Sequence, residues 1–246
     1  MEHLWYTQQA NFLSQLSDHD LADLLAIGKL RTYKKHQIIF QAGSPGDHVY
    51  FLKEGRAKIY HLSPSSKEVI LWFCFSGEMF GMAEVCRGGQ REVYARACND
   101  SEVVMVNQQH FKEFLGTHNE AAMLTIDLLS CRMRVLGDML LNLTSDDVMS
   151  RLIKLFTRLC VRYGKSSGSD IMLDIKLTHQ DMADMIGASR QTVSSTISAL
   201  KKQGVLSIEN HCIYIKSSEM LFNFNNHVLA KEPRNAITGS DNKEYS

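Results

Sequence analysis

The chain has 246 residues, equal numbers of basic and acidic side chains, and 44% hydrophobic residues. This length and composition allow two modest packed domains and exclude a polycation that would bind nucleic acid through net charge alone. The six cysteines have no paired spacing, which predicts a reducing compartment and no disulfide framework. No apolar run approaches the ~20 residues of a membrane span, and the first residues lack a signal-peptide pattern. We therefore expect a cytoplasmic protein with no membrane partner.

Short strands separated by turn signals dominate the segment from Leu30 to about Val106. The stretches "HQIIF" and "HVYFLKEG" flank "QAGSPGD", which has the composition of a turn. The series continues at regular spacing with "RAKIYHL", "KEVILWFCF" and "YARACNDSEVVMV". This pattern predicts a β-barrel or β-roll, with a helix before it at 15–28 and another after it at 107–118. The N-terminal domain is expected at 1–118.

A long helix without proline is predicted over 119–143. Apolar residues nearly encircle it, so it must be covered on more than one side. The β-roll can cover one side and a second copy of the helix the other, although burial within one subunit would satisfy the same pattern. We expect a helix of a symmetric homodimer.

The remaining chain predicts a third unit at 144–216, followed by a polar, partly disordered tail at 217–246. The unit begins with an amphipathic helix, "VMSRLIKLFTRLCVRYG", and a loop, "KSSGSD". It ends with "VLSIENHCIYI", which predicts a β-hairpin. A tight pair of helices is expected between these segments.

Capping signals define the two helices of this pair. Thr178 is a good N-cap for the first helix, and Gly187 can end it. Ser189 can cap the second, expected at 189–203, where apolar residues recur at helical spacing and point inward. The opposite side carries mainly short polar side chains.

A helix of this kind suits the major groove of DNA. The groove is only ~12 Å wide, so short hydroxyls fit where bulky side chains would not. Arg190 and Gln191 lie near the N-terminal end, from which they can reach guanine and adenine edges. A polar face alone is typical of any solvated helix, but here the caps, the tight turn and the hairpin coincide. The predicted DNA contacts are Thr178, Gln180, Ser189, Arg190, Gln191, Ser194, Ser195, Ser198 and Lys202.

The segment "LTHQDMADMIGASRQTVSSTISALKKQGVL" resembles the winged helix-turn-helix of the cyclic-AMP receptor / fumarate-nitrate regulator (CRP/FNR) family. The resemblance extends over about 20–216. It implies an α+β architecture: an N-terminal β-roll (a cyclic-nucleotide-binding-like jelly roll), a long dimerisation helix and a C-terminal winged helix-turn-helix.

The same resemblance implies a homodimeric bacterial transcription regulator of a two-fold symmetric site, with RNA polymerase as a partner if it activates. The base-reading positions of the family fall on Arg190, Gln191 and either Ser194 or Ser195. The cyclic-AMP receptor has Glu in place of Gln191 and Arg in place of Ser195. Part of the half-site is therefore expected to differ.

The stretch "SGEMFGMAEVCRGGQREVYARA" resembles the cyclic-nucleotide cradle of the family. Arg91 matches the arginine that pairs with the cyclic phosphate. Three features depart from the pattern: Met82 replaces a ribose-binding Glu, Glu92 replaces a Ser beside the phosphate, and apolar residues replace adenine-contacting hydroxyls on the long helix. Cyclic AMP is therefore not expected to bind in the usual mode. The candidate effector pocket consists of Gly81, Met82, Arg91, Glu92, Leu136 and Gly137.

The sequence also departs from the ligand patterns of other sensors in the family. The first cysteine is Cys74, so an N-terminal iron–sulfur cluster is not expected. Gly81 and Ala83 stand where haem-based members have their ligands, so that ligation is absent, while haem bound through other histidines stays an open alternative. We predict no metal or cofactor. Cys74, Cys86 and Cys98 recur at twelve-residue spacing, which is consistent either with a redox switch or with small buried side chains.

The sequence contains no phosphate loop, nucleophile elbow or zinc-type spacing, so an enzyme is not expected. The alternative function is a cyclic-nucleotide-binding regulatory protein that acts through protein partners. Such a protein would not need a groove-reading helix.

Overall fold

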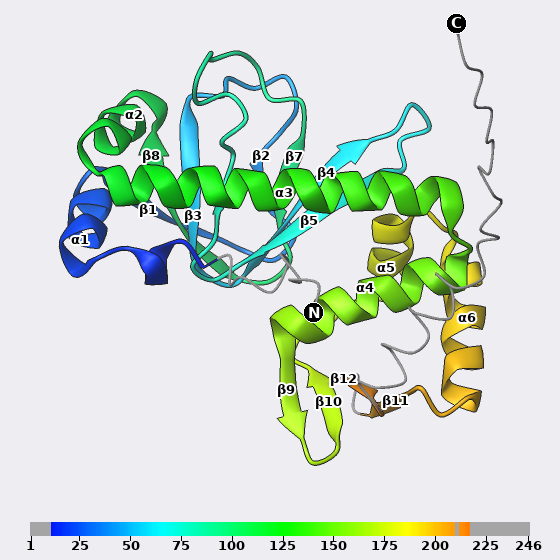
Figure 1. The fold of residues 1–246 in the computed structure, drawn as a ribbon. Helices are drawn as coiled ribbons and strands as arrows, with labels where there is room; N and C mark the ends of the chain where they lie inside the picture. Colours follow the sequence, from blue (N-terminus) through cyan, green and yellow to red (C-terminus); the bar gives the residue numbers. More distant parts are fainter. Residues whose placement is uncertain (1–10, 210–211, 217–246) are drawn as a thin grey trace, which may run out of the picture.

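The computed structural model describes residues 11–209 and 212–216, so the predicted tail at 217–246 lies outside the described residues. Figure 1 shows a β-rich N-terminal body, a long helix α3 (Asn119–Ser145) that crosses it, and a smaller C-terminal body near the far end of this helix. The predicted order of β-roll, long helix and helix-turn-helix is confirmed.

Two four-stranded antiparallel sheets form the N-terminal body. The first has the order β1-β8-β3-β6, with β1 (Gly28–Tyr33), β8 (Ser101–Asn107), β3 (His48–Glu54) and β6 (Met79–Phe80). The second has the order β2-β7-β4-β5, with β2 (Ile38–Phe40), β7 (Tyr94–Ala97), β4 (Arg56–Leu62) and β5 (Glu68–Phe75). A 3-10 turn (Leu13–Gln15), α1 (Asp18–Ala26) and α2 (Gln108–Thr117) complete this body.

The predicted strand stretch at 94–106 is divided between the two sheets, because a polar corner interrupts it. At this corner the Asn99 side-chain oxygen accepts a hydrogen bond from the Arg56 amide at 2.7 Å. The Asp100 carboxylate accepts another from the Lys35 amide at 3.0 Å. These side-chain contacts replace strand pairing, so the chain leaves one sheet there and enters the other.

The long helix α3 buries one face on the β-roll and exposes the other. Ala121, Thr125 and Leu128 are buried, and Ala121 and Leu128 belong to the apolar core of the roll. The exposed face carries a row with the alternating three- and four-residue spacing of a coiled-coil seam. Met133 and Leu140 in this row are 70% and 65% exposed. We call this row the α3 stripe: Met123, Ile126, Ser130, Met133, Gly137 and Leu140.

The C-terminal body contains α4 (Val148–Tyr163), α5 (His179–Ile186) and α6 (Arg190–Lys202) around one apolar core. A four-stranded sheet of order β11-β12-β10-β9 covers this core. Its strands are β9 (Gly164–Ser167), β10 (Asp170–Leu173), β11 (Leu206–Glu209) and β12 (Cys212–Ile215). The predicted wing is confirmed, because β11 and β12 pair antiparallel.

The prediction of a loop at 165–170 is wrong, because this segment forms the β9–β10 hairpin. Ser167 pairs with Asp170 across a two-residue turn in which Gly168 has a φ of +65°. Glycine adopts this left-handed conformation without the steric cost of a side chain. Asp170 is also 2.8 Å from the Lys216 ammonium, which ties the hairpin to the end of the wing.

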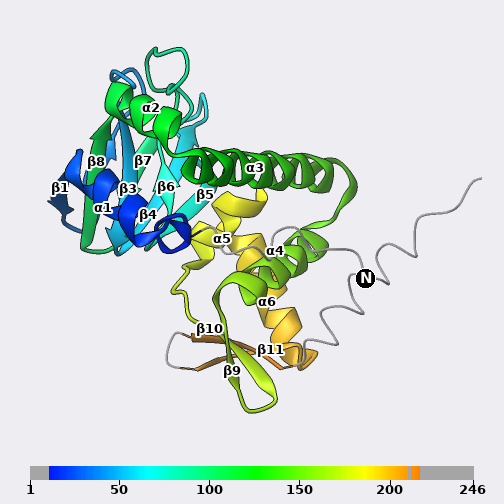
Figure 2. The same cartoon turned by 60° about the vertical axis from the view of Figure 1, so that its left-hand side comes forward.

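The C-terminal body docks on strands β4 and β5 of the roll, and Figure 2 shows α5 beside β5. Arg56 donates a hydrogen bond to the Lys176 carbonyl at 2.7 Å. The Lys67 ammonium donates to the Ala188 carbonyl at 3.2 Å, in the turn between α5 and α6. The rings of Phe75 and Tyr163 lie 4.0 Å apart between their centroids. The two bodies thus share a packed contact.

Candidate nucleic-acid interface and ligand pocket

The turn between α5 and α6 is built by the predicted capping residues. The Thr178 hydroxyl accepts from the Asp181 amide at 3.0 Å, and the Asp181 carboxylate accepts from the Thr178 amide at the same distance. Gly187 ends α5 with a φ of +64°, and a Cβ there would approach a Leu143 methyl group to 2.9 Å. Ser189 accepts from the Thr192 amide at 3.0 Å and starts α6. These contacts fix the angle between the helices.

Helix α6 has the two faces expected of a groove-reading helix. Val193, Ile197 and Leu200 are buried in the C-terminal core. Arg190 and Gln191 occupy its first turn, and both are exposed. The other exposed residues of the predicted set are Ser189, Ser195, Ser198 and Lys202, together with Thr178 and Gln180 next to α6.

Two members of the predicted set are constrained by neighbours. The Ser194 hydroxyl is half-buried and lies 2.7 Å from Nδ1 of His179, a residue that the sequence analysis missed. The Gln180 amide donates to the buried Asp184 carboxylate at 2.7 Å. Ser195 is exposed, although its hydroxyl donates to the Thr192 carbonyl at 2.9 Å. The geometry therefore favours Ser195 over Ser194 as the position facing DNA.

A cavity of about 280 Å³ lies between the β-roll and α3. The structure places Gly81, Met82, Arg91 and Leu136 of the predicted pocket on its wall. Most of the wall is apolar, and the sequence analysis missed these members: Phe40, Ile59, Trp72, Val93, Leu129 and Met133.

Two predicted pocket residues do not line the cavity. Glu92 is exposed, although its neighbour Arg91 is buried and lines the cavity. Gly137 is also exposed, and it belongs to the α3 stripe. A Cβ added at Gly137 would meet none of the described atoms within 4 Å.

The carboxylate beside Arg91 is Glu84, and not Glu92 as predicted. Arg91 pairs with Glu84 and donates to the Gly81 carbonyl at 2.9 Å. It also donates to the His48 carbonyl, and its guanidinium carbon lies 4.5 Å from the ring centroid of Phe40. The internal Glu84 carboxylate thus neutralises the cation that would pair with a cyclic phosphate.

Two donors of the cavity wall lack partners in the described part of the chain. These are the buried Arg91 Nε and Trp72 Nε1 groups. The Arg132 guanidinium lies 5.0 Å from the Trp72 ring centroid, on the same wall. Buried donors without acceptors are costly, so these groups favour a bound acceptor atom.

The three cysteines at twelve-residue spacing lie in different surroundings. Cys74 is buried, Cys98 is half-buried and Cys86 is exposed. Cys74 pairs with Ala57 on β4, and Ala57 pairs on its other side with Ala97, the neighbour of Cys98. Strands two positions apart are separated by about 9.6 Å, which exceeds the Cα distance of a disulfide. The register therefore argues against a Cys74–Cys98 disulfide, and a redox role stays a prediction.

Alkylation at neutral pH is expected to reach Cys86 first. Burial raises the pKa of the Cys98 thiol, and it raises the pKa of Cys160 to about 12. Because the thiolate is the reactive form, Cys160 should react about a thousandfold more slowly than an ordinary exposed thiol. A time course with iodoacetamide, read by peptide mass spectrometry, measures the order. Early modification of Cys160 would contradict the buried geometry.

Comparison with known proteins agrees with both features of the structure, the cavity of the β-roll and the exposed helix α6. Residues 30–118 match the cyclic nucleotide-binding domain, and residues 150–224 match the Crp-like helix-turn-helix domain. The chain therefore joins a β-roll of the ligand-binding type to a DNA-binding domain. The alternative of a regulator that acts only through protein partners is not favoured, since the second match is to a DNA-binding module.

Several curated relatives resemble the chain over most of its length. It is 25% identical over 189 residues to the CRP-like cAMP-activated global transcriptional regulator of Mycobacterium tuberculosis, covering 77% of this chain and 84% of the relative. It is 27% identical over 188 residues to the global nitrogen regulator of a Nostoc species, covering 76% of this chain and 84% of the relative.

Solved structures show the same fold. FixK2 from Bradyrhizobium japonicum gives a TM-score of 0.71 at 22% identity, covering 80% of this chain and 96% of that one. A variant of CooA from Carboxydothermus hydrogenoformans gives a TM-score of 0.75 at 20% identity, and the match covers 89% of this chain and 96% of that one.

These matches define a transcription regulator with a helix-turn-helix DNA-binding domain. The chain belongs to the CRP/FNR family. Its relatives are regulators and not enzymes. Among the described residues, no helix is long and apolar enough to span a membrane.

Proposed function

We propose that this regulator acts in the cytoplasm as a homodimer, joined along the α3 stripe, that reads a two-fold symmetric operator through α6. One observation carries this proposal. Arg190 and Gln191 are exposed in the first turn of α6, and the outer face of this helix carries mainly short hydroxyl side chains. Thr178, Ser189, Ser198 and Lys202 are assigned to phosphate contacts around it. RNA polymerase is the expected further partner at sites that the protein activates.

The cavity beside α3 is the proposed effector site, and its chemistry favours a ligand other than a cyclic nucleotide. Glu84 already pairs with Arg91, where a phosphate would otherwise bind. The wall is mainly apolar, and Trp72 and Arg91 offer buried donors that lack described partners. A compact molecule with an apolar body and a carbonyl or carboxylate acceptor would satisfy this wall.

Strands β4 and β5 supply a physical route from the cavity to α6. Ile59 and Trp72 on these strands line the cavity. On the same two strands, Tyr60, Ile70 and Phe73 pack against Leu177 and Met185 of the C-terminal body. A ligand that shifts β4 or β5 would therefore shift the base of the helix pair. Such coupling is reciprocal, so operator DNA should also change the affinity for the effector.

Cyclic AMP is expected to fail in titration calorimetry with the full chain. The ribose contact at Met82, the adenine contact at Leu136 and the free guanidinium of Arg91 are all missing. At roughly 0.5–3 kcal/mol each, their combined loss is about 1.5–9 kcal/mol, which lowers affinity by about tenfold to a millionfold. Micromolar binding that also tightens operator binding would contradict this proposal and restore an ordinary cyclic-AMP receptor.

A further inference from the structure

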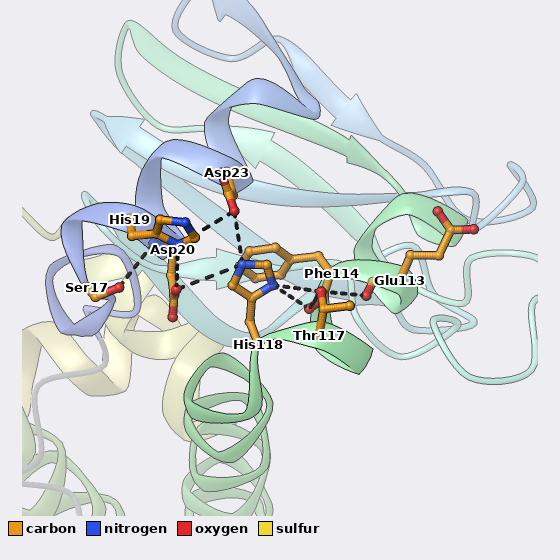
Figure 3. A network of polar contacts seen from close by, with 8 residues as sticks. All are labelled: Ser17, His19, Asp20, Asp23, Glu113, Phe114, Thr117 and His118. Atoms are coloured by element: carbon orange, nitrogen blue, oxygen red, sulfur yellow. Dashed lines mark hydrogen bonds and ion pairs between the residues drawn. The ribbon is translucent and has the colours of Figure 1, made fainter.

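Two histidines and two aspartates from separate parts of the chain converge beside the β-roll (Figure 3). His19, Asp20 and Asp23 belong to α1, and His118 stands at the junction of α2 and α3. Nδ1 of His19 lies 3.4 Å from an Asp20 oxygen and 3.7 Å from an Asp23 oxygen. Nε2 of His118 lies 3.2 Å from Asp23 and 3.9 Å from Asp20. We call these four residues the α1 cluster.

We propose that the α1 cluster binds a first-row divalent cation, with Zn²⁺ as the best fit. In a tetrahedral zinc site with bonds of about 2.0–2.1 Å, neighbouring ligand atoms are separated by roughly 3.3–3.4 Å. The four nitrogen–oxygen separations in the α1 cluster are 3.2–3.9 Å. The ligand atoms of His19, Asp20 and His118 all lie within 4.8 Å of one another, so these three residues form the core of the proposed site, with Asp23 beside it. Imidazole nitrogen and carboxylate oxygen are both ordinary zinc ligands, and two carboxylates would balance the charge of the ion.

The orientation of His118 is independent support for a cation. Its Nδ1 atom lies 2.9 Å from the Phe114 carbonyl, which can only accept a hydrogen bond, so Nδ1 carries a proton. The ring also stacks on Phe114 at 4.2 Å between centroids. In the neutral imidazole, the Nε2 lone pair then faces carboxylate oxygens, which is repulsive unless a cation lies between them. Ligating histidines in metal sites are held in this way, with the other ring nitrogen donating to a carbonyl.

The spacing along α1 supplies a second independent argument. His19 and Asp23 are four residues apart, so they lie on one face of the helix and can bind one ion together. A hollow lined by Asp23, His110, Glu113 and His118 opens beside the α1 cluster and would give an ion access from solvent. A bound ion would fasten α1 to the first residue before α3, and so would brace the start of the proposed dimerisation helix.

The competing occupant of the same space is a proton on Nε2 of His118. The hydrogen bond to the Phe114 carbonyl, with the Asp23 and Asp20 carboxylates, raises the pKa of His118. A protonated His118 would form a plain ion pair with Asp23 and would leave His19 without a role. The two occupants can be distinguished by adding metal.

The test is a titration of ZnCl₂ into untagged full-length protein that has been stripped with a chelator, followed by calorimetry. One ion per chain is expected, and His19→Ala, Asp23→Asn and His118→Ala should each weaken its binding at least tenfold. His61→Ala, at the exposed position of β4, is the matched control and should change nothing. Co²⁺ in place of Zn²⁺ should show the visible absorption of a tetrahedral site in the unaltered chain.

Asp23→Asn and His19→Ala keep the proposal testable if His118→Ala fails to fold, because both side chains are largely exposed on α1. Absence of stoichiometric binding would overturn the proposal in favour of the proton. Binding that survives unchanged in both α1 variants would place the ion elsewhere and would equally overturn it. Neither outcome would alter the proposed DNA-binding function, which does not depend on this cluster.

Discussion

Replacement of Arg190 with alanine is expected to cost roughly 1–3 kcal/mol of operator-binding free energy per half-site. Arg190 is exposed at the first position of α6, where a guanidinium can form a bidentate contact with guanine. Two half-sites together lose about 2–6 kcal/mol, which is about 30-fold to 10⁴-fold in affinity. Fluorescence anisotropy with operator DNA and with random DNA at fixed salt measures this loss.

Lys202→Ala provides the matched control for this measurement. Lys202 lies in the last turn of α6, so it is expected to contact phosphate only. This variant should weaken binding to operator DNA and to random DNA by the same factor. The slope of log affinity against log salt concentration should fall by about one, because one phosphate contact is lost. An Arg190→Ala variant that behaves in the same way would show that Arg190 touches only the backbone.

Glutamate at Met133 or Leu140 is expected to separate the dimer into folded monomers and to weaken operator binding at least a hundredfold. Both side chains lie on the α3 stripe and are mostly exposed in one chain. A second copy of the stripe would bury them, and a two-fold axis would then place the introduced carboxylates near one another. Sedimentation velocity measures the oligomeric state, and the same samples serve for DNA binding.

Leu25→Glu and Leu128→Glu separate this effect from general damage. Leu25 is 44% exposed on α1, away from the stripe, so its variant should remain a dimer. Leu128 is 7% exposed within the core of the β-roll, so its variant should unfold instead of dissociating. Persistent dimers in both stripe variants would place the subunit contact elsewhere.

Local chemistry in the sequence predicted the helix pair well. The caps at Thr178 and Ser189 and the left-handed Gly187 depend only on neighbouring residues, and the structure confirms all three. The β-roll and the long helix were predictable for another reason: their hydrophobic patterns repeat over many residues. The β9–β10 hairpin was missed because its strands carry few β-branched side chains and are stabilised by pairing with β12.

The ligand pocket was only partly predictable, because its contacts join segments far apart in the chain. Arg91 was identified by resemblance, but its pairing with Glu84 depends on how the segment between them folds. Trp72 reaches the cavity from β5, and no short-range pattern marks it. Similarly, His118 is 95 residues from Asp23 in the chain, so its contact with α1 could not be predicted from local spacing.

Selection of binding sites from random DNA tests the central account most directly, with the unaltered chain and Gln191→Glu run in parallel. The account predicts a two-fold symmetric site for the unaltered chain, with half-sites about one helical turn apart. It also predicts that Gln191→Glu changes the preferred base at one position of each half-site and leaves the preferred bases at the other positions unchanged. Failure to enrich any symmetric site, or an identical site for both proteins, would contradict the assignment of α6 as the helix that reads the operator.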